Sequence, residues 1–231
     1  MATTVKKPSR TQFGPPKIQM DKPAPKPATL KYMYIAKWGN EGLDDGEFYL
    51  PWDVEVTTSG KVYVVEKNGR IQKFDSKGKF LTKWGSPGSE DGQFNHPQGA
   101  AVDSAGNVYV SDTDNHRVQK FDSEDKLRIK WGSTGSGDGQ FNYPQGAAVD
   151  STGNVYVVDK LDNRIQKFDS EGNFLTKWGS MGGVDGEFVF PSSVAVDFAG
   201  KVYVVDRGNN RVQKFDSEGK FLTKWGSPGS G

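Results

Sequence analysis

Reactive side chains are scarce in this 231-residue chain, which has no cysteine and only two histidines, His96 and His116. Without thiols there is no disulfide framework, cysteine nucleophile, iron–sulfur centre or sulfur-ligated zinc site. Two histidines are too few for a multi-histidine metal centre, and the sequence has neither a Gly-x-Ser-x-Gly elbow nor a phosphate-binding loop. We therefore expect no catalytic residues, no metal site and no cofactor.

Arginines and Asp-Gly pairs recur along the chain and suggest two further kinds of site. The Asp-Gly pairs lack the Asp-x-Asp-x-Asp spacing of a calcium loop, which favours turns instead. The arginines could form a basic ring that binds nucleic acid. Alternatively, each could form a structural ion pair with an acid four or five residues earlier, and we favour the ion pairs. The pairs are Glu66 with Arg70, Asp112 with Arg117, Asp159 with Arg164, and Asp206 with Arg211.

These residues recur because the whole sequence repeats. Five of the six tryptophans are spaced by 46, 47, 47 and 47 residues, and a glycine follows each: Trp38, Trp84, Trp131, Trp178 and Trp225. Between them an Asp-Gly-(Glu/Gln)-Phe phrase returns four times, with a proline three residues after each phenylalanine. A period in the forties with strand-like units indicates a propeller or a solenoid. We expect the tryptophans to pack between neighbouring units.

Each unit divides into four short strands. In the second unit we expect strands at 99–103, 107–112, 117–122 and 126–131, which are β-branched or aromatic and are bounded by Asp, Ser, Asn and Gly. No 3.6-residue apolar period survives across the glycines, so helices are excluded. Four strands joined by short turns form an antiparallel meander, the blade of a β-propeller. The predicted fold is all-β, with blades at 51–84, 97–131, 144–178 and 191–225.

The units resemble the NHL-repeat family of β-propellers. The matching phrases are Pro-x-Gly-x-Ala-Val-Asp, Gly-Asn-Val-Tyr-Val, and an Asp-x-x-Asn-x-Arg-(Val/Ile)-Gln-Lys-Phe phrase at 112–121, 159–168 and 206–215. The resemblance covers about residues 32–226 and implies four-stranded blades around a central axis. Two units depart from the pattern. The first has Glu55 and Thr57 and a shorter turn after Glu66, and the third has Asp162 where the phrase has asparagine.

A segment before the first blade complicates closure of the ring. Residues 34–38, within an expected extra strand at 32–38, copy the outer strand at 80–84, so the chain has 17 expected strands, one too many for simple closure. Three arrangements remain: an open arc whose ends pair with another chain, a four-bladed ring with one outer strand displaced or doubled, or a fragment of a longer array. Because an open arc leaves apolar blade faces in water, we favour assembly with itself or with a larger complex.

Residues 1–31 form an expected basic, proline-rich extended tail before the propeller at 32–231. Seven basic residues and one acid give the tail a charge of +6, whereas the remainder carries 23 against 28, or −5. The tail is expected to be either a solvated leader or an arm that docks onto an acidic partner or a nucleic acid. The candidate partner-binding residues of the tail are Lys6, Lys7, Arg10, Lys17, Lys22 and Lys26.

A second set of candidates lies in the turns between the second and third strands. Turns of a meander alternate between its two ends, so these turns share a face with the linkers between blades. They also differ most among the units, either because they bind a partner or because nothing constrains them. The candidates are Trp52, Lys67, Asn68, Asp114, His116, Lys160, Leu161, Arg207 and Asn209; Trp52 stands where other units have glutamine or serine.

These features predict a non-catalytic protein-interaction scaffold with a rigid propeller surface and a basic docking arm. The alternative is an RNA-binding propeller, which the acidic blade region disfavours because phosphate binding needs a concentrated basic surface. A propeller hydrolase or lyase is the second alternative, disfavoured because the two histidines lie in a linker and a turn. The sequence shows neither a secretory signal nor an apolar run long enough to span a membrane, so a cytoplasmic location is expected.

Overall fold

The structure is a computed structural model that describes residues 35–226. It contains four four-stranded antiparallel sheets, here called blades 1 to 4. Blade 1 comprises β1 (Pro51–Val56), β2 (Val62–Glu66), β3 (Ile71–Phe74) and β4 (Phe80–Trp84). Blade 2 comprises β5 (Gly99–Val102), β6 (Val108–Asp112), β7 (Arg117–Phe121) and β8 (Leu127–Trp131). Blade 3 comprises β9 (Pro144–Val149), β10 (Val155–Asp159), β11 (Arg164–Phe168) and β12 (Phe174–Trp178). Blade 4 comprises β13 (Ser193–Val196), β14 (Val202–Asp206), β15 (Arg211–Phe215) and β16 (Phe221–Trp225). The predicted all-β meanders are confirmed.

The strands of one blade differ in burial because they differ in their neighbours. Strands β6 and β10 are buried along their whole length, as expected for strands covered on both faces by adjacent blades. The outer strands β8 and β12 alternate between half-buried and exposed residues. This alternation is typical of a strand with one face against the core and one face in water.

Aspartates fix the tight turns inside each blade. In the turn between β3 and β4, Asp75 Oδ1 accepts hydrogen bonds from the backbone N–H groups of Lys77 and Lys79 at 2.8 and 2.9 Å. These bonds stabilise the ionised carboxylate and lower the pKa of Asp75. The corresponding turn of blade 2 has Asp125 in the left-handed region, with φ of 65°, where the other blades have glycine. Its carboxylate accepts a hydrogen bond from Lys73 of blade 1 at 2.9 Å and so links two blades.

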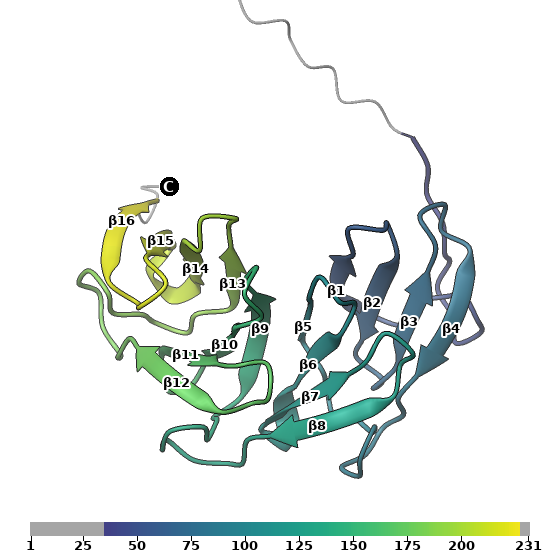
Figure 1. Cartoon of the computed structure of the whole chain (residues 1–231), viewed down its shortest axis with the longest axis horizontal. Coiled ribbons are helices and arrows are strands. Elements are labelled where there is room, and N and C mark those ends of the chain that lie inside the picture. The colour runs from purple at the N-terminus through teal and green to yellow at the C-terminus, as the bar shows by residue number, and fades with distance from the viewer. Residues whose placement is uncertain (1–34, 227–231) are drawn as a thin grey trace, which may run out of the picture. The chain divides into compact units, whose positions relative to one another are not determined.

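The four blades follow one another around a common axis, which their inner strands line (Figure 1). The inner strands contact one another in the order β1, β5, β9, β13. Three hydrophobic clusters fill the spaces between successive blades. In each, the tryptophan of one blade packs on a phenylalanine of the next, as in the pair Trp84 and Phe121, whose ring centroids are 5.7 Å apart. The predicted inter-blade role is confirmed for Trp84, Trp131 and Trp178, whereas Trp38 and Trp225, at the two ends, are 41% and 49% exposed.

The extra strand expected at 32–38 is not formed over the part that the structure describes. Residues 35–38 have no regular secondary structure, and 32–34 lie outside the described range. A β-strand needs a neighbouring edge for its backbone hydrogen bonds, and β15, beside which an outer strand would lie in blade 4, already pairs with β16. Sequence similarity to the outer strands therefore did not ensure strand pairing. No helix among residues 35–226 is long and apolar enough to cross a membrane.

Candidate functional site

Buried ion pairs fix the face on which the candidate turns lie. Arg164 Nε donates a hydrogen bond to Asp159 Oδ2 at 2.8 Å, which joins the first residue of β11 to the last residue of β10. The same guanidinium donates to the carbonyls of Ser136, Gly137 and Gln140 in the linker from blade 2, at 2.7 to 2.9 Å. Each arginine therefore ties its own blade to the preceding linker. The predicted arginine–acid pairs are confirmed in all four blades.

The turns between second and third strands are hydrogen-bonded to the linkers, so the two do share one face, here called the linker face. The backbone N–H of Leu161 donates to the carbonyl of Asn142 at 3.1 Å, and that of Asp114 donates to Asn95 at the same distance. The fourth residue after the strand that ends in the acid has nearly the same backbone conformation in blades 2 to 4. His116, Asn163 and Asn210 occupy that place with φ between 51° and 53°. The Asp162 departure therefore leaves this left-handed residue in place, but the turn of blade 3 is not a 3-10 helix, as the turns of blades 2 and 4 are in η1 (Thr113–Asn115) and η2 (Arg207–Asn209).

A pocket of about 470 Å³ opens on the linker face at the centre of the four blades. We call it the axial pocket. Its lining residues come from every blade: Trp52, Asp53, Gln98, Gln145, Gly146, Lys160, Ser192, Ser193 and Arg207. The indole of Trp52 is 53% exposed and supplies an aromatic surface. The pocket also contains two cations, one carboxylate, two amides and two hydroxyls. These groups can bind a polar or acidic ligand beside the aromatic ring of Trp52.

The four inner strands place corresponding residues around this pocket. Trp52, Gln98, Gln145 and Ser192 each follow the proline that begins the first-strand segment of their blade. Gln145 Nε2 donates a hydrogen bond to Gln98 Oε1, which joins blades 2 and 3 at the rim. Asp53 Oδ2 accepts the backbone N–H of Ala100 at 2.8 Å and joins blades 1 and 2. Burial raises the pKa of Asp53.

A narrower cavity of about 200 Å³ lies between the inner strands and contains one ionisable side chain, Glu55. Its other lining residues are the alanines and valines Ala101, Val102, Ala147, Ala148, Val149, Val194, Ala195 and Val196. Burial raises the pKa of Glu55 to about 7, and the negative charge of Asp53 adds to the effect. The other blades have alanine at this position, so blade 1 alone brings a carboxyl group to this cavity.

Replacing Glu55 with glutamine is expected to remove a pH dependence of stability. Because the folded-state pKa lies above the ordinary 4.5, the neutral carboxyl contributes stability that is complete below about pH 4.5 and is lost as the pH rises through 7. At pH 8 the Glu55→Gln protein should be more stable by about 2 kcal/mol, after allowance for partial solvent access. Urea denaturation at pH 5 and pH 8 measures this effect. The prediction would be contradicted if the free energy of unfolding changed by the same amount between pH 5 and pH 8 in the wild type and in the Glu55→Gln protein.

The opposite mouth of the axis is lined by the turns between first and second strands. This cavity, of about 230 Å³, contains Asp103, Asp150 and Asp197, together with the fully exposed ring of Phe198. The three carboxylates accept hydrogen bonds within their own blades, such as that from Tyr109 Oη to Asp103 at 3.1 Å. We therefore assign them to turn structure. Among residues 35–226, no three or more His, Asp or Glu side chains are grouped so as to hold a metal ion.

Three of the predicted partner-binding residues meet in the axial pocket, namely Trp52, Lys160 and Arg207. Asp114 is instead paired with His96, with Oδ2 and Nδ1 2.7 Å apart. Lys67 and Asn68 lie in the short turn of blade 1, and the exposed Leu161 lies in that of blade 3.

Two further candidates have contacts within the fold. The ring of His116 stands edge-on to Tyr143, with centroids 5.0 Å apart. The Asn209 amide donates to Gly182 and Asp206, each at 2.9 Å. The tail candidates Lys6, Lys7, Arg10, Lys17, Lys22 and Lys26 lie outside the described residues.

Sequence reasoning missed the rest of the axial pocket. Asp53, Gln98, Gln145 and Ser193 line it, and Glu55 lies deeper along the axis. The signal was present in the alignment of the repeats, since the residue after each first-strand proline is Trp, Gln, Gln and Ser in turn. What the alignment lacked was the information that these four positions converge on one axis.

Comparison with known families and structures agrees with this architecture. A model of the NHL repeat matches residues 94–121, and a model of a 6-bladed β-propeller matches residues 148–230. Virginiamycin B lyase from Staphylococcus aureus is similar in structure, with a TM-score of 0.59 and 16% identity over 77% of this chain and 55% of the lyase. No curated protein sequence matches the chain.

Two other solved structures are similar to the same extent. Hydrazine synthase of Kuenenia stuttgartiensis aligns with a TM-score of 0.59 and 13% identity over 79% of this chain and 52% of that chain. The WD40 repeats of RRP9 align with a TM-score of 0.60 and 14% identity over 79% and 52%. At these identities the similarity shows the fold alone. The chain spans about half the length of these proteins.

Proposed function

The chain is an NHL-repeat β-propeller protein, and from that premise we propose that it is a non-catalytic scaffold that binds a protein partner through the axial pocket. The observation that supports this proposal is that the positions whose residues differ most among the four similar blades lie around one pocket. Trp52, Lys160 and Arg207 come from three blades and line one pocket. If these residues differed among the blades only because nothing constrained them, there would be no reason for an aromatic ring and two cations to line the same cavity.

The chemistry of the pocket suggests the kind of segment that it binds. Lys160 and Arg207 supply positive charge for a carboxylate of the partner, and an arginine can bind such a group through two hydrogen bonds. Trp52 offers a flat apolar surface of the type enriched at binding hot spots. The amides Gln98 and Gln145 can bond to peptide groups. We therefore propose an acidic peptide segment with an apolar or aromatic residue as the occupant.

Peptide display against the whole protein tests the proposal, with random linear peptides as the probe. Selected peptides should be enriched in Asp and Glu, and their affinity should fall at least about tenfold in Lys160→Ala, Arg207→Ala and Trp52→Gln proteins. Trp52→Gln introduces the residue found in blades 2 and 3. Lys177→Ala, which removes an exposed lysine of outer strand β12, is the matched control and should bind as the wild type does. Selected peptides that bind all four variants equally would refute the assignment.

RNA is the second candidate, because an exposed indole beside two cations is also suited to stacking and phosphate contact with a single strand. Filter binding of single-stranded RNA over a salt series distinguishes the two. With two phosphate contacts, the logarithm of affinity should fall with a slope of about −1.4 against the logarithm of salt. An RNA-binding function would be favoured over the protein scaffold if the wild type bound RNA but no peptide, and if the Lys160→Ala and Arg207→Ala proteins lost the binding of RNA.

A further inference from the structure

The two end blades each present a face that the interior blades bury. We call the side of a blade that meets the preceding blade its leading face and the other side its trailing face. Between blades 3 and 4, Tyr156, Val158 and Ile165 of the trailing face pack on the leading face of blade 4, which includes Val202 and Val204. The interfaces between blades 1 and 2 and between blades 2 and 3 are built from corresponding residues.

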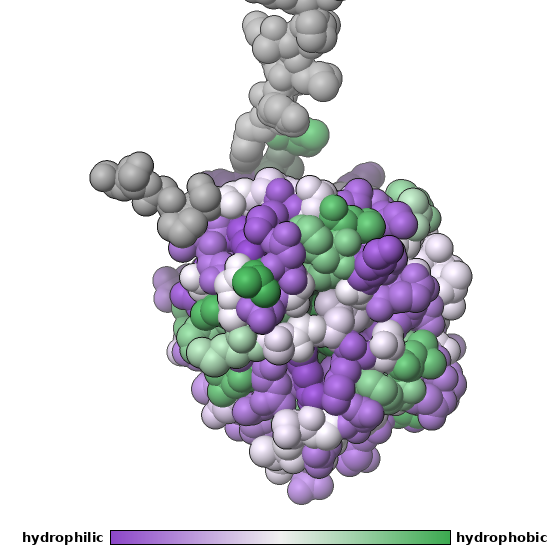
Figure 2. All heavy atoms as spheres, turned by 90° about the vertical axis from the view of Figure 1, so that its left-hand side faces the viewer, coloured by the Kyte–Doolittle hydropathy of each residue, from purple (hydrophilic) through white to green (hydrophobic). Residues whose placement is uncertain are grey.

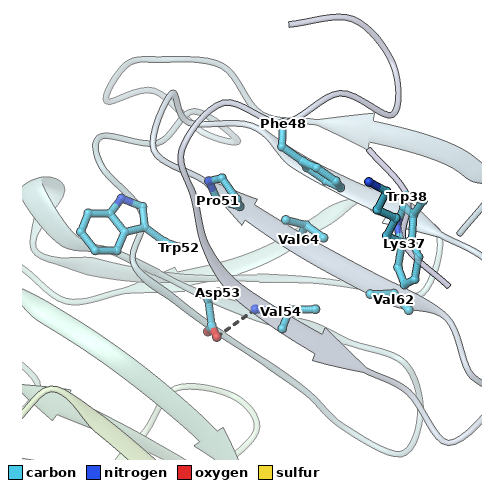
Figure 3. Close-up of a pocket in the computed structure, with 9 residues that line it drawn as sticks. All are labelled: Lys37, Trp38, Phe48, Pro51, Trp52, Asp53, Val54, Val62 and Val64. Atoms are coloured by element: carbon cyan, nitrogen blue, oxygen red, sulfur yellow. Dashed lines mark hydrogen bonds between the residues drawn. The ribbon is translucent and has the colours of Figure 1, made fainter. Parts of the chain in front are cut away.

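The leading face of blade 1 has the same kinds of residues but lacks the facing Tyr-Val-Ile group. Val62, Val64 and Phe74 correspond to Val202, Val204 and Phe215 of blade 4. In place of a neighbouring trailing face there is an apolar pocket of about 460 Å³, seen in Figure 3, whose lining includes Trp38, Phe48 and Val64. Val54 is 57% exposed there, whereas its counterpart Ala100 is 1% exposed.

The trailing face of blade 4 is also without a neighbouring blade, and it is more exposed than the leading face of blade 1, where Val62, Val64 and Phe74 remain buried. Val205 is 39% exposed and Trp225 is 49% exposed, whereas Val65 and Val158, the counterparts of Val205, are fully buried. Figure 2 views the side of the structure that carries β12 and β16, and it shows hydrophobic residues at the surface among hydrophilic ones. The exposure of Val205 and Trp225 is that of an interface without its second half.

From these two faces we infer that the protein associates head to tail, with the trailing face of blade 4 of one copy seated on the leading face of blade 1 of a second copy. A second copy is the indicated occupant because its blade 4 offers Tyr203, Val205, Val212 and Trp225. The corresponding sets at the internal interfaces are Tyr63, Val65, Ile71 and Trp84 in blade 1 and Tyr156, Val158, Ile165 and Trp178 in blade 3, whereas blade 2 has Ser111 in place of the valine. This contact goes beyond the proposed function, since it uses the blade ends and leaves the axial pocket free.

Polar contacts at the internal interfaces have a matching pair at the ends. Lys120 and Lys167 reach across to the carbonyls of Ser170 and Ser217 in the next blade, at 2.7 and 3.0 Å. The corresponding lysine of blade 4 is Lys214, which lies over the Tyr203 ring at 4.9 Å. In a second copy its acceptor would be the carbonyl of Ser76. The charges do not match as well, because blade 1 has Lys77 at the position of Glu171 in blade 3, so a lysine would take the place of an acid near Lys214.

Trp38 holds the place that Trp225 of the second copy would take. A methyl group on Gly78 would lie 2.5 Å from the Trp38 ring, as one on Gly219 would from Trp178. The two tryptophans thus cover the same turn glycine in blades 1 and 4. Docking in the register of the repeat therefore displaces Trp38 from blade 1, and the indole acts as a competitor for the contact.

Sedimentation equilibrium of the whole chain over a wide concentration range tests the inference. The wild type should show a mass of at least twice the 25.4 kDa of one chain. Val54→Asp and Val205→Asp should each weaken association by at least about tenfold, because each buries a charge at one end of the contact. Both side chains are exposed in a single copy, so circular dichroism should show both variants folded. Leu175→Asp, an exposed position on β12, is the control and should associate as the wild type does.

Mixing the variants gives the sharper result. Each retains the face that the other has lost, so a mixture of Val54→Asp and Val205→Asp at high concentration should form a one-to-one dimer that neither forms alone. Trp38→Ala should tighten association by about tenfold, since the competing ring is gone. A monomeric wild type, a mixture without the dimer, or weaker association of the Trp38→Ala protein would each overturn the inference.

Discussion

Arg164→Met is expected to lower the free energy of unfolding by about 3–5 kcal/mol, the cost of breaking a buried ion pair from one side. Asp159 is fully buried and accepts Arg164 Nε at 2.8 Å. Burial raises the pKa of Asp159 to about 6 even beside this arginine. Without the arginine the carboxylate keeps its desolvation penalty and loses its countercharge. Three linker carbonyls also lose the hydrogen bonds that the arginine donates to them.

Denaturant unfolding at pH 8 followed by circular dichroism measures this loss. Lys177→Met is the control within the same blade, because Lys177 and Asp138 form an exposed pair at 2.6 Å that should contribute about 0.5 kcal/mol or less. The penalty of Arg164→Met should shrink as the pH falls from 8 towards about 6, because Arg164 lowers the pKa of Asp159 and the carboxyl without it takes up a proton at a higher pH. A loss below about 1 kcal/mol at pH 8 would show that the pair does not hold the linker to the blade.

Gly99→Ala is expected to destabilise the protein by about 3 kcal/mol, at the upper end of overpacking effects. A methyl group at Gly99 would lie 2.4 Å from the carbonyl oxygen of Gln145 and 2.9 Å from the Cα atom of Gly146. Both atoms belong to the backbone of the next inner strand, so relief requires β5 and β9 to move apart. The same movement should break the hydrogen bond between Gln98 and Gln145 and weaken peptide binding in the axial pocket.

Gly139→Ala separates steric contact from backbone strain. Gly139 has a φ of 75°, but nothing lies within 4 Å of the added methyl group, so its replacement should cost about 1 kcal/mol and leave peptide binding unchanged. Thermal denaturation of both variants, together with peptide affinity, gives the comparison. Equal losses of stability, or intact peptide binding in the Gly99→Ala protein, would contradict close packing of the inner strands as the cause.

The features that recur within the four blades were predictable from the sequence. The strands of blade 2 lie within one residue of their predicted bounds, because β-branched runs and Asx turns are local signals. The pairing of Arg117 with Asp112 follows from their places at the facing ends of neighbouring strands. The packing of Trp131 between blades follows from its recurrence in every unit.

What the sequence left open depends on how the blades are placed in space. Trp52, Lys160 and Arg207 are up to 155 positions apart in the chain, and only the fan of blades brings them to one pocket. The raised pKa of Glu55 arises from apolar side chains that three other blades contribute. Residues 35–38 repeat an outer strand yet form none, because pairing requires a neighbouring edge. Local periodicity thus determines each blade, whereas burial, exposure and charge at the axis and at the two ends are properties of the assembled set.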